Sequence, residues 1–226
     1  MNIIHKVFLL AQDIYIKFNS FISPSIIHNT EKHTIIKKAL FYKNIENVPG
    51  DYLEFGVYEG TSLKGAATYW KKISKDKINF YGFDSFTGMK IEKGDEHPFY
   101  GTFDYSTDFE IIKKRFKNLP EVKLVKGFFQ ETLKKHPKEY GINKAAVVLI
   151  DCDLYSAAKS SFNFIKDLVS EGAILILDDY FNYKANKNKG VQAAFQEFCK
   201  NNKIECIELI KYGIGGNVFI ITKIKK

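Results

Sequence analysis

Residues 173–181, AILILDDYF, place five apolar residues directly before two adjacent aspartates and two aromatic residues. Residues 145–150, AAVVLI, are also continuously apolar. A strand with one face in water alternates apolar and polar residues, whereas a strand covered on both faces is apolar throughout. The two stretches therefore predict central strands of a parallel sheet with helices on both faces. They also raise the question of why such a strand ends in two carboxylates.

The rest of the chain continues this rhythm of short apolar segments and stretches of helical length. The first predicted strands lie at 51–56, 79–84, 122–127, 145–151 and 173–178. A helix follows at about 190–201, and two further strands, at 204–210 and 216–222, are joined by five residues. A connection that short joins antiparallel strands, because a parallel crossover needs about a dozen residues or more. The pattern predicts an α/β fold with a doubly wound, mostly parallel sheet of seven strands that ends in one antiparallel strand.

Two helical patterns, at 2–18 and about 32–45, precede the first strand. They predict a helical extension at 1–48, followed by a single domain at 49–226. The first helix is amphipathic, and its apolar run is too short to span a bilayer, so no transmembrane segment is predicted. Contact with a membrane surface is an alternative. The extension favours packing against a second copy of the chain, and thus a homodimer.

The segment 88–107 fits neither a helix nor a strand, because it combines three glycines and a proline with charged and aromatic residues. Loops of this length in compact domains are usually functional. We therefore predict a lid over the site, with a disordered surface insertion as the alternative.

The composition excludes several classes of protein. The chain has 226 residues and a net charge of +8, but its excess of lysine is scattered along the sequence. Without a basic stripe interleaved with aromatic residues, a nucleic-acid-binding role is not expected, and attraction for an anionic substrate is a minority alternative. The three cysteines lack CxxC spacing, so neither a disulfide framework nor a zinc site is indicated, and a reducing cytoplasm is predicted.

The first two predicted strands carry residues typical of a nucleoside site. Glu54, Gly56 and Gly60 form an E-x-G-x-x-x-G pattern at a strand-to-helix turn, where glycine allows a close approach of a ligand to the backbone. Asp84 ends the second strand, where an acidic residue can accept hydrogen bonds from ribose hydroxyls. A tight turn and a helix cap are the structural alternatives for these residues. Because both features occur in order on consecutive strands, the nucleoside site is favoured.

Aspartates follow the next two buried strands, at Asp151 and at the pair Asp178 and Asp179. The carboxyl ends of parallel strands meet at one edge, so these side chains should converge beside the nucleoside. Three partly buried carboxylates need a countercharge, and an oxygen-only ligand set favours Mg²⁺. The alternatives are a loop cap and a pair with a lysine, and Asp153 could replace Asp151.

These motifs together resemble the class I S-adenosylmethionine-dependent methyltransferases, and more narrowly the macrocin O-methyltransferase (TylF/MycF) family. The resembling stretches span roughly residues 50–200 and are GDYLEFGVYEGTSL, FYGFDSFTGM, VKGFFQETL, VLIDCDLYS, AILILDDYF and GVQAAFQEF. The resemblance implies a Rossmann-like fold, S-adenosyl-L-methionine as methyl donor, S-adenosyl-L-homocysteine as product, and Mg²⁺. It also implies roles for individual residues. Those near the donor would be Glu54, Gly56, Gly60, Ser62, Asp84, Ser85, Gly127 and Phe128, and those at the metal Asp151, Asp178 and Asp179.

The implied reaction is O-methylation of a hydroxyl on a sugar or related polyol, in natural-product or polysaccharide biosynthesis. The family's histidine base follows the aspartate pair, whereas the last histidine here is His136, and Leu154 stands where catechol-type relatives have a lysine. We therefore expect Asp151 or an ordered water to take the proton, with His97 as the alternative. Methylation of a nitrogen or a nucleic acid, or a non-catalytic nucleoside-binding module, are the competing functions.

Overall fold

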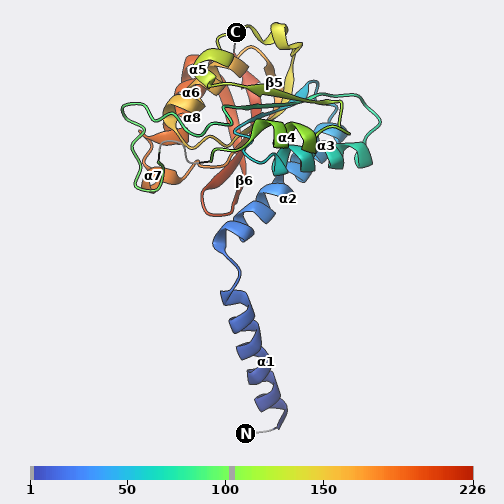
Figure 1. The fold of residues 1–226 in the computed structure, drawn as a ribbon, viewed down its shortest axis with the longest axis vertical. Helices are drawn as coiled ribbons and strands as arrows, with labels where there is room; N and C mark the ends of the chain where they lie inside the picture. Colours follow the sequence, from blue (N-terminus) through green and yellow to red (C-terminus); the bar gives the residue numbers. More distant parts are fainter. Residues whose placement is uncertain (1–2, 102–104, 226) are drawn as a thin grey trace.

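The computed structural model describes residues 3–101 and 105–225, and its centre is one seven-stranded sheet (Figure 1). The strand order is β3-β2-β1-β4-β5-β7-β6. The bounds are β1 Asp51–Phe55, β2 Phe80–Asp84, β3 Val122–Lys126, β4 Ala145–Ile150, β5 Val169–Leu177, β6 Ile204–Tyr212 and β7 Gly216–Ile224. The strands β1 to β5 are parallel, and β7 runs antiparallel to both β5 and β6. The predicted mostly parallel sheet is confirmed. The one reversed strand is β7, which lies between β5 and the edge strand β6.

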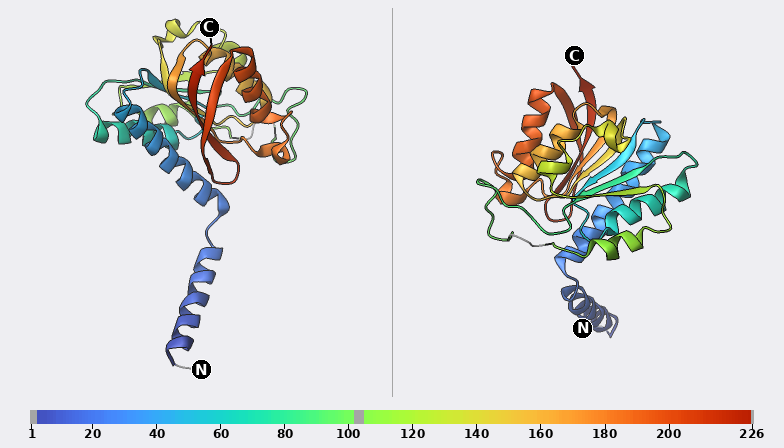
Figure 2. Two further views of the ribbon diagram at one scale, coloured as in Figure 1. Left: turned by 180° about the vertical axis from the view of Figure 1, so that it is seen from behind. Right: turned by 45° about the horizontal axis from the view of Figure 1, so that its top comes forward.

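Helices cover both faces of this sheet (Figure 2). Their bounds are α1 Ile3–Ser20, α2 Pro24–Ile45, α3 Thr61–Ile73, α4 Phe109–Arg115, α5 Phe129–Thr132, α6 Tyr155–Ile165, α7 Asn182–Ala185 and α8 Gly190–Asn201, with a 3₁₀ turn at Pro137–Tyr140. The segment labelled α7 is a turn with left-handed backbone at three consecutive residues, Tyr183, Lys184 and Ala185.

The core has two layers, one on each face of the sheet. On one face, α6 and α8 pack through side chains such as Phe162 and Phe198 against alternate residues of the central strands. On the other face, α2, α3 and α4 pack through side chains such as Leu40, Leu63 and Ile112. All six residues of β4 are buried, as expected for a strand that both layers cover.

The helix α2 begins at Pro24, well before the predicted start near residue 32. The Ser23 hydroxyl accepts a hydrogen bond from the Ser25 amide, and Pro24 occupies the first turn, where its missing N–H costs nothing. Both residues lie between the two helices that the sequence predicts, at 2–18 and about 32–45, whereas in the structure they begin α2. α2 packs mainly against α3 and contributes core residues, although it lies within the predicted N-terminal extension.

The helix α1 extends away from the rest of the molecule (Figure 1). Every residue of this helix is exposed, including its isoleucine, leucine and phenylalanine side chains. Within the described residues, none of the helices combines the length and the apolar character that crossing a bilayer requires.

Candidate active site

A cavity of about 700 Å³ opens at the carboxyl edge of the parallel strands. Its wall comes from the first turns of α2, the segments after β1, β2, β3, β4 and β5, the 88–107 loop and the β6–β7 turn. A volume of this size is typical of sites that enclose a small molecule. The single cavity therefore collects residues from most of the predicted motifs.

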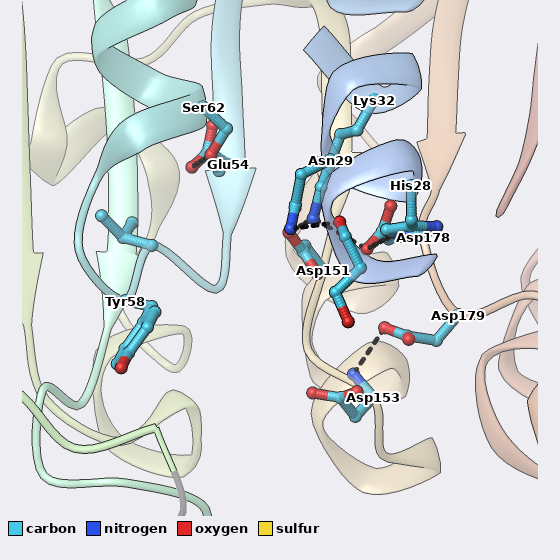
Figure 3. Close-up of polar contacts among 12 residues, drawn as sticks. His28, Asn29, Lys32, Glu54, Tyr58, Ser62, Asp151, Asp153, Asp178 and Asp179 are labelled. Atoms are coloured by element: carbon cyan, nitrogen blue, oxygen red, sulfur yellow. Dashed lines mark hydrogen bonds and ion pairs between the residues drawn. The ribbon is translucent and has the colours of Figure 1, made fainter. Parts of the chain in front are cut away.

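The three predicted metal ligands meet in this cavity (Figure 3). Asp151 follows β4, and Asp178 and Asp179 follow β5. These strands are paired through Ile150 and Leu177, so both chains leave the sheet at the same level. One carboxylate oxygen from each of the three aspartates lies within 4.8 Å of the others. Asp153 is not part of this group; its backbone amide donates a hydrogen bond to Asp179 Oδ2.

A lysine from α2 bridges two of the carboxylates. Lys32 Nζ lies 2.7 Å from Asp151 Oδ2 and 2.8 Å from Asp178 Oδ2, and its side chain is only 10% exposed. The sequence had left open a lysine pair as the alternative to a metal. The structure shows such a pair. Lys32 binds Asp151 and Asp178, two of the three aspartates of the candidate metal site.

Asp178 has two further donors. His28 Nε2 lies 3.0 Å from Asp178 Oδ2, and the Tyr212 hydroxyl donates to Asp178 Oδ1 at 2.6 Å. The other ring nitrogen of His28 accepts a hydrogen bond from the Ile214 amide. In a neutral imidazole, the nitrogen that faces Asp178 is therefore the one that carries the proton.

The pKa values of the three aspartates are shifted in different directions. Burial would raise the pKa of Asp178, but the Lys32 ammonium and His28 hold it well below its usual range. Burial, together with the nearby carboxylates, raises the pKa of Asp151 and of Asp179 well above their usual range. One ammonium thus faces three carboxylates, and it does not compensate all of them.

This donor set fits a divalent cation. The three converging groups are all carboxylate oxygens, which Mg²⁺ prefers, and the cluster has an excess of negative charge. Within the described part of the chain, the hydrogen-bond donors of Asp179 are both neutral: the Asp153 amide and the Asn182 side chain. The residues present could therefore hold Mg²⁺.

Asp84 connects the ends of β1 and β2. Its Oδ2 accepts hydrogen bonds from the amides of Val57 and Tyr58 at 2.7 and 2.9 Å, and its Oδ1 accepts one from the Phe86 amide at 2.6 Å. The carboxylate is thereby held at the wall of the cavity. Since Oδ1 has one backbone donor, it retains a lone pair for a ligand hydroxyl.

The structure divides the predicted donor-binding residues into two groups. Gly56, Asp84, Ser85 and Phe128 line the cavity. Glu54, Gly60, Ser62 and Gly127 are not among its lining residues.

The second group has structural partners. Glu54 is fully buried and accepts hydrogen bonds from Tyr52 and Ser62 at 2.7 and 2.6 Å. Gly60 precedes α3 with φ +76°, and a Cβ there would lie 2.8 Å from the Phe116 ring. Gly56, from the first group, also has to be glycine, because a Cβ at this position would lie 1.7 Å from the Asp151 carbonyl oxygen.

The 88–107 loop, of which residues 102–104 lie outside the described residues, contributes part of the cavity wall. Asp95 fixes it: this buried carboxylate accepts hydrogen bonds from the Ser156 amide at 3.1 Å and the Ser156 hydroxyl at 2.5 Å. Ser156 lies in the first turn of α6, where a carboxylate also interacts favourably with the helix dipole. Ser85 shapes the start of the loop by donating to the Gly88 carbonyl.

His97 lies on this loop and lines the cavity. Its Nδ1 accepts a hydrogen bond from the Phe99 amide, and its ring packs against Tyr100 and Tyr183. Partial burial lowers the pKa of His97. To act as a base through Nδ1, the ring would have to give up its hydrogen bond to Phe99.

Sequence reasoning missed the contribution of α2. His28, Asn29 and Lys32 line the cavity, and Figure 3 shows them facing the aspartates. The spacing of His28 and Lys32, four residues apart, would put them on one helix face. That pattern was invisible while the helix was expected to begin near residue 32.

Comparison with known proteins gives this site a context. The profile of the family described as Macrocin-O-methyltransferase (TylF) matches residues 30–212. Mycinamicin III 3''-O-methyltransferase of Micromonospora griseorubida is 26% identical over 148 residues, which cover 60% of this chain and 57% of that protein. The 8-demethyl-8-(2,3-dimethoxy-alpha-L-rhamnosyl)-tetracenomycin-C 4'-O-methyltransferase of Streptomyces olivaceus is 25% identical over 146 residues, which cover 60% and 54%. The matched part thus spans little more than half the length of these relatives.

Solved structures confirm the fold. The O-methyltransferase NovP superposes with a TM-score of 0.67 at 22% identity, covering 84% of this chain and 79% of that chain. The chain has the class I methyltransferase fold that its sequence predicted.

Proposed function

The chain belongs to the macrocin O-methyltransferase (TylF) family, and we propose that it transfers a methyl group from S-adenosyl-L-methionine to a hydroxyl of a sugar or related polyol, with Mg²⁺ as cofactor. One observation carries the proposal. A single cavity is lined both by Asp84, at the end of β2, and by the aspartates after β4 and β5. A donor at Asp84 and an acceptor at the aspartates would therefore share one enclosed space.

The donor side would hold the nucleoside. Asp84 would accept hydrogen bonds from the ribose hydroxyls through the free lone pair of Oδ1, while its backbone donors keep it in place. Phe128 offers an aromatic ring at the cavity wall for the adenine. Glu54 and Gly60 would support this site indirectly, since Glu54 fixes Ser62 in the first turn of α3 and Gly60 permits that turn.

The acceptor side would use the carboxylates. Asp151, Asp178 and Asp179 would hold Mg²⁺, which, when bound, orients a hydroxyl and lowers its pKa. Asp151, whose own pKa burial raises, would take the proton directly or through a water. Enclosing donor and acceptor in one cavity supplies proximity, which can lower a barrier by about 7 to 11 kcal/mol in favourable cases.

The cavity wall also suits a sugar. Tyr58, Phe99, Tyr100 and Tyr105 contribute aromatic rings to it, and Phe99 is 71% exposed. Such rings can cover the apolar face of a sugar, while the polar groups of His28, Asn29 and Asn182 could bind its hydroxyls. The relative from Streptomyces olivaceus acts on a rhamnosyl compound, which supports a sugar within natural-product or polysaccharide biosynthesis.

The donor site is tested by calorimetric titration of S-adenosyl-L-homocysteine into the purified protein. We expect micromolar binding that weakens about tenfold or more in Asp84→Ala, because a carboxylate hydrogen bond to a ligand is lost. Asp76→Ala, an acidic residue at the far end of α3, is the control and should bind as the native chain does. Absence of binding to the native protein would refute the proposed donor.

The metal requirement is tested by methyl transfer to a panel of sugars after removal of metal with EDTA. Activity should disappear and return with Mg²⁺. Asp151→Asn should keep the affinity for S-adenosyl-L-homocysteine and lose activity by about a hundredfold or more, the scale expected when an acid–base group is removed. Unchanged activity in Asp151→Asn would refute the metal-centred mechanism. The proposed donor site would not be affected by that result.

A further inference from the structure

The ammonium of Lys32 lies where a divalent cation would have to bind. Its Nζ is within 2.8 Å of one oxygen of Asp151 and one oxygen of Asp178, two of the three candidate ligands. A cation at those oxygens would sit about 2.0 to 2.6 Å from each of them. The two positive charges would then be almost in contact inside a mostly buried site, which is strongly unfavourable.

The hydrogen bonding of Asp178 decides which group must move. Its Oδ2 already has two donors, Lys32 at 2.8 Å and His28 at 3.0 Å, so a metal at this oxygen must replace one of them. The position of the His28 ring is fixed by a hydrogen bond from the Ile214 amide to its Nδ1. Lys32 has a flexible four-carbon stem and lines the cavity, so its ammonium can swing away while the helix stays in place.

We propose that Lys32 and the divalent cation occupy the carboxylate cluster alternately. Lys32 neutralises part of the cluster in the metal-free protein, and the arriving cation displaces the ammonium, still protonated, into the cavity. Lys32 therefore lowers the affinity of the site for the metal and keeps the buried aspartates compensated when the metal is absent. The inference rests on the proposed cation site, but it is tested by metal binding and does not depend on methyl transfer.

The test is Mn²⁺ binding, followed by electron paramagnetic resonance, to the native protein and to Lys32→Met. Removing the competing charge should tighten Mn²⁺ binding by about tenfold or more. Lys43→Met is the matched control: Lys43 lies on the same helix and is also buried, but its Nζ donates to the Val48 carbonyl. Lys43→Met should bind Mn²⁺ as the native protein does.

The thermal midpoint gives a second readout of the same variants. Mg²⁺ should raise the midpoint of Lys32→Met more than that of the native protein, because a ligand stabilises the folded state more when it binds more tightly. Equal Mn²⁺ affinities for the native protein and Lys32→Met, with both folded, would overturn the proposal. Tighter Mn²⁺ binding in Lys32→Met, together with no methyl transfer by the native protein, would uphold this proposal and refute the proposed function instead.

Lys32→Met could fail to fold, since it leaves buried carboxylates without a countercharge. In that case the reactivity of Lys32 is measured in the native protein, with and without metal. Acetylation of lysines, located by mass spectrometry, should modify Lys32 slowly without metal and several times faster with saturating Mg²⁺, whereas Lys43 should react equally in both. If metal does not change the reactivity of Lys32, the ammonium is not displaced and the proposal fails.

Discussion

Glu54 is the clearest case of a single residue whose environment changes its chemistry. It is fully buried at the end of β1, and burial raises its pKa from 4.5 to about 7, although the hydroxyls of Tyr52 and Ser62 partly offset this. The folded state therefore binds the Glu54 proton more tightly than the unfolded chain does. As the pH rises from about 4.5 to about 7, the unfolded chain loses that proton first, and the folded state is destabilised.

Glu54→Gln should remove this dependence, because the amide does not titrate. Between about pH 4 and pH 8, the free energy of unfolding of the native protein should fall relative to that of Glu54→Gln by about 2 to 3 kcal/mol. Urea denaturation of both proteins across this range measures the difference. Glu121→Gln, at a carboxylate paired with Lys71, is the control for the loss of one carboxylate elsewhere in the chain. Parallel stability curves for Glu54→Gln and the native chain would mean that burial does not shift the pKa of Glu54.

At this scale the sequence predicted part of the site. Strand ends converge in any parallel sheet, so the meeting of Asp151 with Asp178 and Asp179 followed from the order of apolar segments. The partner of these aspartates did not follow. Lys32 precedes Asp151 by 119 positions, and no local pattern links a lysine on one helix to a particular strand end.

Among the elements, the described part of the 88–107 loop, predicted to be a lid, has well-defined contacts with the rest of the domain. Its contact with α6 runs through Asp95, which binds both the amide and the hydroxyl of Ser156. The Tyr183 hydroxyl also donates to the Asp95 carbonyl, so the loop is tied to the turn after β5. We propose that this anchoring lets the loop act as a lid over the bound acceptor.

Asp95→Ala should release the lid, since it removes a capping carboxylate that contributes about 1 to 2 kcal/mol. Limited proteolysis should then cut the segment 88–101 several times faster than in the native protein, because local opening exposes it more often. Glu96→Gln alters the exposed neighbouring residue, keeps an acceptor for the Gly94 amide and should leave the cleavage rate unchanged. Equal cleavage of Asp95→Ala and the native chain would show that the loop is held by other contacts.

The element boundaries show where sequence patterns suffice. The central strands match their predicted ranges to within a residue or two, apart from the earlier start of β5, because continuous apolar runs bounded by glycine and aspartate mark a strand from both sides. The start of α2 was misplaced because serine and proline occur both in linkers and in helix caps. Only the hydrogen bond to Ser23 distinguishes the two cases.

At the scale of the whole molecule, the helix α1 has an exposed apolar face. Ile3, Val7, Leu10 and Ile14 are each 60% or more exposed, and their spacing of four, three and four residues places them on one side of the helix. Contiguous apolar faces of this kind usually mark an interaction site. We propose, as the sequence led us to expect, that this face packs against a second copy of the chain.

Leu10→Asp combined with Ile14→Asp should abolish that packing, because two carboxylates cannot be buried at an apolar interface without partners. Light scattering after size-exclusion chromatography should give a dimer for the native protein and a monomer for the double variant. Gln12→Asp adds one negative charge on the opposite side of α1 and should remain dimeric. A native chain that is monomeric at micromolar concentration would refute the dimer. If that monomer then floats with vesicles of anionic lipid while the double variant does not, the same face binds a membrane surface, since lysines at positions 6 and 17 flank it.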